Sequence, residues 1–125
     1  NLSLANHELS RSAGQIEYFI QATWTATTDP LIHRYHLYVR KSHESQFRLY
    51  VSLEKNAERR VHIYNLTLGT NYDCKLVEED TLGNMTQAEL ISNHQLTKSF
   101  EGTASTVSSI SGKSVQNVGS AQLGG

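Results

Sequence analysis

Apolar and polar residues alternate along several short stretches of the chain, and this alternation predicts β-strands. In residues 16–26 every even position is apolar or aromatic, and these positions are Ile16, Tyr18, Ile20, Ala22, Trp24 and Ala26. Successive side chains of a strand point to opposite faces, so we expect this stretch to cover a core with one face and to meet water with the other. Phe19 departs from the alternation.

The same period of two recurs further along the chain. One run has Tyr35, Leu37 and Val39 as its predicted inward residues, and the next has Phe47, Leu49, Val51 and Leu53. With the weaker candidates, about seven strands are expected, in residues 2–9, 16–26, 34–40, 47–53, 61–66, 72–76 and 86–97. The connections are too short to carry helical crossovers, so the pattern predicts an all-β fold, an antiparallel sandwich or barrel.

The composition of the chain changes near its C-terminal end. Residues 102–125 are mostly Ser, Thr and Gly and contain no aromatic residue. We therefore expect a β-sandwich domain over residues 1–97 and a Ser/Thr/Gly-rich extension or linker over residues 98–125. A flexible linker is one interpretation of this extension. The other is that a partner or assembly orders it, because such a segment does not offset its own ordering entropy.

Length, charge and cysteine content exclude several classes of function. The chain of 125 residues is about one domain long, and it opens at Asn1, so we expect either a processed N-terminus or a piece of a longer polypeptide. The net charge of −1 disfavours nucleic-acid binding. No apolar run approaches the roughly 18 residues of a membrane-spanning helix, so we expect no membrane insertion. A single cysteine, Cys74, excludes an internal disulfide and a zinc site of several cysteines.

One segment carries a family resemblance. Residues 66–72 read Leu-Thr-Leu-Gly-Thr-Asn-Tyr, which resembles the Leu-x-Pro-Gly-Thr-x-Tyr signature at the tyrosine corner of fibronectin type III domains. The resemblance implies that the Tyr72 hydroxyl bonds the backbone of the preceding corner and that Gly69 supplies its bend. Leu68 departs from the family's proline. Glu78 departs as well, at an inward position where we expect either a place at the rim beside water or a cationic partner.

Further landmarks follow the same order as in that family. Residues 80–86, Asp-Thr-Leu-Gly-Asn-Met-Thr, are similar to the turn before the last strand, and a Trp, an Asp-Pro pair and a Tyr precede them at similar spacing. The resemblance implies a fibronectin type III-like, immunoglobulin-like antiparallel β-sandwich. The residues that carry it are Trp24, Tyr35, Leu66, Gly69, Tyr72, Asp80 and Gly83.

Residues 24–32 and 35–40 look most like fibronectin type III modules of bacteriophage tail-tip and tail-fibre proteins. This likeness implies a noncatalytic structural or adhesion module on the virion tail. Its expected partners are the protein subunits of a larger, homo-oligomeric assembly, with a host-surface glycan or protein as a further contact. An accessory glycan-binding or spacer module of a secreted bacterial carbohydrate-active enzyme is the alternative. A receptor ectodomain is a third hypothesis, which requires glycans on Asn65 or Asn84.

The outward positions of two predicted strands bring arginine and aromatic residues together. If these strands are neighbours, one outer face carries Arg34, His36, Tyr38, Arg40, Arg48 and Tyr50. Arginine and aromatic side chains anchor many interfaces, so this is a candidate contact face for a protein or a glycan. The plainer interpretation is an ordinary solvated face with residues of high strand propensity.

No motif in the sequence indicates catalysis, a cofactor or a metal. We expect no enzyme, because the serine-hydrolase elbow, the phosphate loop and the zinc-protease motif are missing. Cys74 has inward parity and is expected to be buried and inert. Of the acidic run Glu78, Glu79 and Asp80, turn chemistry accounts best for Asp80. His33 and His36 are an odd number of positions apart, which predicts opposite faces and no shared zinc.

Overall fold

The computed structural model describes residues 1–98, which form seven β-strands and one short 3-10 turn. The elements are β1 Leu2–Ser10, η1 Ser12–Gly14, β2 Ile16–Trp24, β3 Ile32–Lys41, β4 Arg48–Glu54, β5 Arg60–Ile63, β6 Asn71–Asp80 and β7 Met85–Gln95. The prediction for residues 98–125 lies, except for Lys98, outside the described residues. In the part that is described, no helix is long and apolar enough to cross a membrane.

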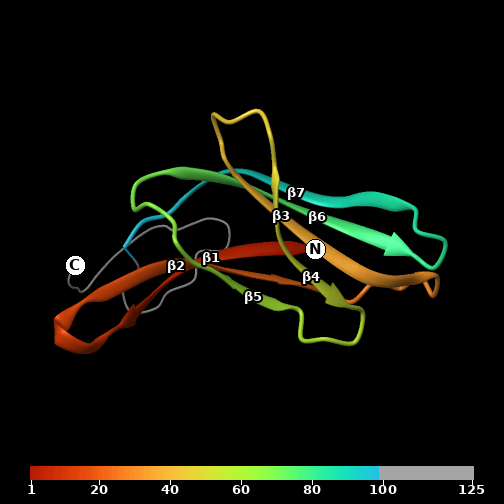
Figure 1. Cartoon of the computed structure of the whole chain (residues 1–125), viewed down its shortest axis with the longest axis horizontal. Coiled ribbons are helices and arrows are strands. Elements are labelled where there is room, and N and C mark those ends of the chain that lie inside the picture. The colour runs from red at the N-terminus through yellow and green to blue at the C-terminus, as the bar shows by residue number, and fades with distance from the viewer. Residues whose placement is uncertain (99–125) are drawn as a thin grey trace.

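The strands form two antiparallel sheets, a three-stranded one in the order β1-β2-β5 and a four-stranded one in the order β4-β3-β6-β7 (Figure 1). One apolar cluster joins them, with Ile20, Ala22 and Ile63 from the first sheet and Leu37 and Cys74 from the second. All five are nearly inaccessible to water. The predicted all-β architecture with two antiparallel sheets is therefore confirmed, and its sandwich character follows from the shared core.

Two tyrosine hydroxyls fix the ends of this core. The Trp24 and Tyr35 rings meet edge to face at 5.6 Å, and the Thr27 N–H donates to the Tyr35 hydroxyl at 2.8 Å. The Thr67 N–H donates to the Tyr72 hydroxyl at 2.7 Å, across a corner where Gly69 has a φ of +87°. That φ lies in the left-handed region, which glycine adopts at the least cost. The hydrogen bond expected from Tyr72 is present.

The β1–β2 hairpin extends further than the alternation of β2 implies. β5 pairs with β2 only between Ile20 and Thr23, and Figure 1 shows the hairpin running out beyond β5 at the left of the view. Ile16 is therefore 47% exposed rather than inward. Ala26 is exposed as well, because β2 ends at Trp24.

Phe19, the exception in the alternation, is buried on the outer side of the three-stranded sheet. Its ring contacts those of His7, His62 and Tyr64, with centroids 4.8 to 5.7 Å apart. The three neighbouring rings cover an apolar side chain that has no second layer within residues 1–98. Period-two analysis misses such burial because it counts only one face.

A β-bulge changes the expected faces of β4. Leu37 pairs with Val51 and Tyr38 pairs with Leu49, which leaves Tyr50 as the extra residue. Leu49 consequently shares the outer face with Tyr38 and is 52% exposed, contrary to its predicted inward position. Tyr50 instead bridges the two sheets, since its hydroxyl donates to the His62 carbonyl and accepts from the Tyr64 N–H, each at 3.0 Å.

Candidate functional site

The outer face of the four-stranded sheet holds most of the predicted contact residues. Arg34, His36, Tyr38 and Arg40 lie on the outer side of β3, at alternate positions. Their partners across β6 are Glu79, Val77, Lys75 and Asp73, in that order. Two polar clusters and one row with exposed leucines follow each other along this face.

Arg48 and Tyr50 do not lie with them, which corrects the predicted composition of this face. The bulge in β4 places Arg48 opposite Val39, an inward-facing residue of β3, and its side chain is 82% exposed. The Tyr50 hydroxyl is bonded to the backbone of β5, as described above. The correction has one cause, because a bulge reverses the parity of every residue on its far side.

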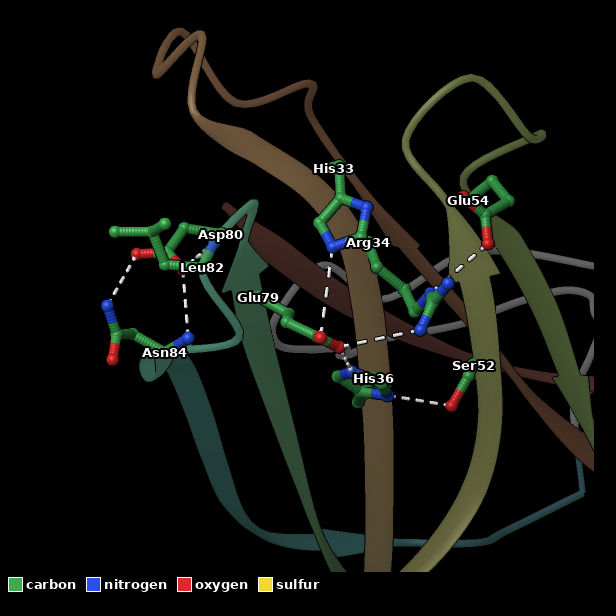
Figure 2. Close-up of polar contacts among 9 residues, drawn as sticks. All are labelled: His33, Arg34, His36, Ser52, Glu54, Glu79, Asp80, Leu82 and Asn84. Atoms are coloured by element: carbon green, nitrogen blue, oxygen red, sulfur yellow. Dashed lines mark hydrogen bonds and ion pairs between the residues drawn. The ribbon is translucent and has the colours of Figure 1, made fainter.

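Glu79 is the centre of the first polar cluster, as Figure 2 shows. His36 Nε2 lies 2.7 Å from one carboxylate oxygen, Arg34 Nη1 lies 3.7 Å from the same oxygen, and His33 Nε2 lies 3.8 Å from the other. The hydrogen bond from His36 and the neighbouring positive charge of Arg34 hold the pKa of Glu79 below its ordinary value, against the effect of desolvation. Glu79 is thus an ionised acceptor near neutral pH.

The convergence of His33 and His36 on Glu79 overturns the prediction of opposite faces. Ile32 pairs with Asp80 and Arg34 pairs with Glu79, so His33 is the extra residue of a second irregularity. The irregularity rotates His33 toward the side that His36 occupies. Even so, no group of three or more His, Cys, Asp or Glu side chains within residues 1–98 is arranged to hold a metal ion.

His36 links three strands. It is only 6% exposed, and its Nδ1 lies 2.7 Å from the hydroxyl oxygen of Ser52 on β4 while its Nε2 faces Glu79 on β6. A carboxylate only accepts hydrogen bonds, so Nε2 carries the hydrogen. In the neutral imidazole Nδ1 is then an acceptor, and the Ser52 hydroxyl donates to it.

Asp73 is the centre of the second cluster and is 3% exposed. Ser42 Oγ and Arg40 Nε donate to its carboxylate at 2.6 and 2.9 Å, and the Asn93 N–H donates at 2.9 Å. Burial acts to raise the pKa of Asp73, but the hydrogen bonds from Ser42, Asn93 and Arg40 outweigh it and hold the pKa below its ordinary value. The buried charge is therefore compensated.

Between the two clusters lies a row that crosses all four strands. Leu49, Tyr38, Lys75 and Leu90 are successive cross-strand partners. Lys75 Nζ lies 5.1 Å from the centre of the Tyr38 ring and 4.5 Å from that of Phe47, and the guanidinium of Arg40 lies 4.1 Å from Phe47. These cations already cover aromatic surface that a bound ring would need.

The acidic run of β6 divides into three environments. Glu79 faces outward, and Glu78 has the opposite parity and is half-buried opposite Tyr35 and Thr86. Asp80 ends the strand and accepts hydrogen bonds from the Leu82 and Asn84 N–H groups at 2.9 and 2.8 Å (Figure 2). These bonds, first of all those from Asn84, hold the pKa of Asp80 below its ordinary value, as its role in the turn requires.

Sequence reasoning did not find Ser52, Ser42 or Asp73 as members of these clusters. Asp73 has outer parity beside the inward-facing Tyr72 and Cys74, which is a weak signal for a buried charge. Burial raises the pKa of Cys74 itself to about 12, so its thiol stays protonated.

A scan against models of protein families finds no match for this chain, and a search of curated proteins finds none either.

Proposed function

We propose that this chain is a noncatalytic, fibronectin type III-like structural and adhesion module of a bacteriophage tail or tail fibre. In this proposal it works as a rigid spacer on the virion. Its partners are protein subunits of the same homo-oligomeric assembly, with a host-surface glycan or protein as a further contact. The proposal requires no cofactor.

The observation that carries the proposal is the hydrogen bond between Thr67 N–H and the Tyr72 hydroxyl at 2.7 Å. Tyr72 lies near the start of the sixth strand, and a tyrosine there that bonds the backbone a few residues upstream is a hallmark of immunoglobulin-like sandwiches. It is also the landmark on which the fibronectin type III resemblance of residues 66–72 rests. The step from the fold to the phage tail depends on the likeness of residues 24–32 and 35–40.

The order of the strands in the two sheets supports a fibronectin type III-like domain rather than a constant-type immunoglobulin domain. In those domains the fourth strand joins the sheet of the first two strands. Here β4 pairs with β3 in the sheet that also holds β6 and β7. Both open sides of the sandwich are closed by side chains, by Tyr50 between β4 and β5 and by Asn6, which donates to the Gln95 carbonyl at 3.0 Å. Such closure suits a rigid spacer.

The alternative, an accessory glycan-binding module of a secreted enzyme, has weaker support on this face. Stacking on a sugar needs free aromatic faces. Lys75 lies over Tyr38, and Tyr50 is engaged at the seam between the sheets. Both rings of the predicted face therefore have roles within the domain.

Immunogold microscopy tests the proposal. An antibody against the purified chain is applied to particles of the phage whose genome encodes it, with pre-immune serum as the control. Gold on the tail or fibre is the expected result. Unlabelled particles, with the chain found instead in the secreted fraction of a bacterial culture, contradict the proposal and favour the accessory module.

A further inference from the structure

Ser52, His36 and Glu79 form a continuous chain of hydrogen bonds across three strands. Both contacts of the imidazole measure 2.7 Å, Nδ1 to the Ser52 hydroxyl and Nε2 to the Glu79 carboxylate. A hydroxyl bonded to an imidazole whose other nitrogen is held by a carboxylate is the arrangement that activates serine nucleophiles. We propose that Ser52 is an activated nucleophile that accepts an acyl group from a reactive ester.

The direction of each hydrogen bond fits this role. In the neutral form of His36 the Glu79 carboxylate fixes the ring hydrogen on Nε2, which leaves the Nδ1 lone pair pointing at the Ser52 hydroxyl. Here Nδ1 is positioned to take the proton of Ser52, with the ring nitrogens exchanged relative to the best-known triads.

The proposed nucleophile, Ser52, and its base, His36, differ in their exposure to solvent. Ser52 is exposed on β4, an edge strand, whereas His36 is 6% exposed. An electrophile therefore reaches the hydroxyl from solvent while the imidazole stays fixed by packing. Arg34, one row along the same face, lies beside this chain of hydrogen bonds, with its guanidinium paired to Glu54 and Glu79 (Figure 2).

The reaction is a single acyl transfer to the protein. Ser52 Oγ forms a bond to the carbonyl carbon of the ester, and its proton passes to His36 Nδ1. The bond from that carbon to the leaving oxygen breaks, and the departing alkoxide or phenoxide takes the proton from His36 where it needs one. The products are an ester of Ser52 and a free alcohol or phenol, with neither oxidation nor reduction. This modification site goes beyond the proposed spacer role and does not depend on it.

The test uses the full folded chain and p-nitrophenyl acetate, with acetylation assigned residue by residue by fragmentation mass spectrometry. Ser92 is the internal control, because it is exposed on β7, the other edge strand of the same sheet. A positioned general base accelerates such steps by roughly 10²- to 10⁴-fold. We therefore expect Ser52 to be acetylated at least about 100-fold faster than Ser92.

Three variants assign the roles. Ser52→Ala should abolish acetylation at position 52, and His36→Gln and Glu79→Gln should each reduce the Ser52:Ser92 ratio at least about tenfold. The ratio is insensitive to general loosening of the fold, which raises both rates. A wild-type ratio near one, or a ratio that Glu79→Gln leaves unchanged, overturns the proposal. If His36→Gln shows no cooperative thermal transition, Glu79→Gln alone decides.

Discussion

The two faces of the four-stranded sheet are built from alternate residues of the same strands, but different parts of the molecule shield their side chains from water. On the inner face, Leu37 and Cys74 are covered by the second sheet. On the outer face, His36 and Asp73 are almost as inaccessible, although they are covered by their own neighbours. Inner burial therefore depends on filled volume, and outer burial depends on polar partners.

Truncation of an inner side chain should have the largest effect on stability. Leu37→Ala removes a side chain that is 1% exposed, and large-to-small changes of this kind cost about 3 kcal/mol of unfolding free energy. Leu49→Ala, on the adjacent strand but 52% exposed, should cost less than about 0.5 kcal/mol. Urea unfolding of both variants makes the comparison. Equal losses would mean that the bulge does not expose Leu49.

Removal of the buried charge of Asp73, at the centre of the second polar cluster, should have the second-largest effect on stability. Asp73→Asn weakens the bonds from Ser42, Arg40 and Asn93 and leaves the guanidinium of Arg40 without its anion. We expect a loss of about 2 kcal/mol, which is below the range for fully buried pairs because Arg40 is partly exposed. Glu54→Gln is the matched control, since its pair with Arg34 is exposed and should contribute less than about 0.5 kcal/mol. Chemical denaturation gives both values, and similar losses would contradict the account of outer burial.

The contrast between the faces also explains how far the sequence predicts the structure. Alternation predicted the strands and the inner residues Tyr35 and Leu37, because one-sided burial leaves a period-two signal. Alternation also predicted that Leu49 and Ile16 face inward, whereas both are exposed. A bulge is set by backbone pairing, and the exposure of a hairpin depends on where its neighbouring strand ends; neither leaves a signal in composition.

The candidate site was less predictable than the fold. The outer parity of Arg34, His36, Tyr38 and Arg40 could be predicted, but the cluster around Glu79 could not. His33 joins it through a register irregularity, and Ser52 joins it as the cross-strand partner of His36. A cross-strand partner is identified only once the register is known, because a shift of one residue exchanges the faces.

The seam between the sheets should show a smaller effect. Tyr50→Phe removes the hydroxyl that bonds the His62 carbonyl and the Tyr64 N–H but keeps the ring. Tyr50 is 40% exposed, so water replaces part of the loss and we expect a cost of about 1 kcal/mol. Hydrogen exchange should rise at the amide of Tyr64, and Tyr38→Phe is the control on the outer face. An unchanged rate at Tyr64 would show that the bulge does not connect the sheets.

Acidification should produce the smallest effect, and it acts through His94 on β7 and His7 on β1. Burial lowers the pKa of His94 below its ordinary value of 6.5, and the pKa of His7 is lowered by burial and by the charge of His62. A histidine whose folded pKa lies below its unfolded pKa contributes stability that is fully present above about pH 6.5 and is lost as the pH falls through the folded value. The carboxylates at the centres of the polar clusters, Asp73 and Glu79, have lowered pKa values and titrate only in stronger acid.

Thermal unfolding measured between about pH 7.5 and 5.5 isolates the histidines, because model carboxylates titrate near pH 4. His94→Gln keeps a donor for the Asn6 side-chain oxygen, which His94 Nε2 meets at 2.7 Å, and removes the titrating group. Its midpoint temperature should fall less on acidification than that of the wild type. His43→Gln changes an exposed histidine and should leave the wild-type slope intact. Should both variants follow the wild-type curve, the burial of His94 is not what makes the domain sensitive to acid between these pH values.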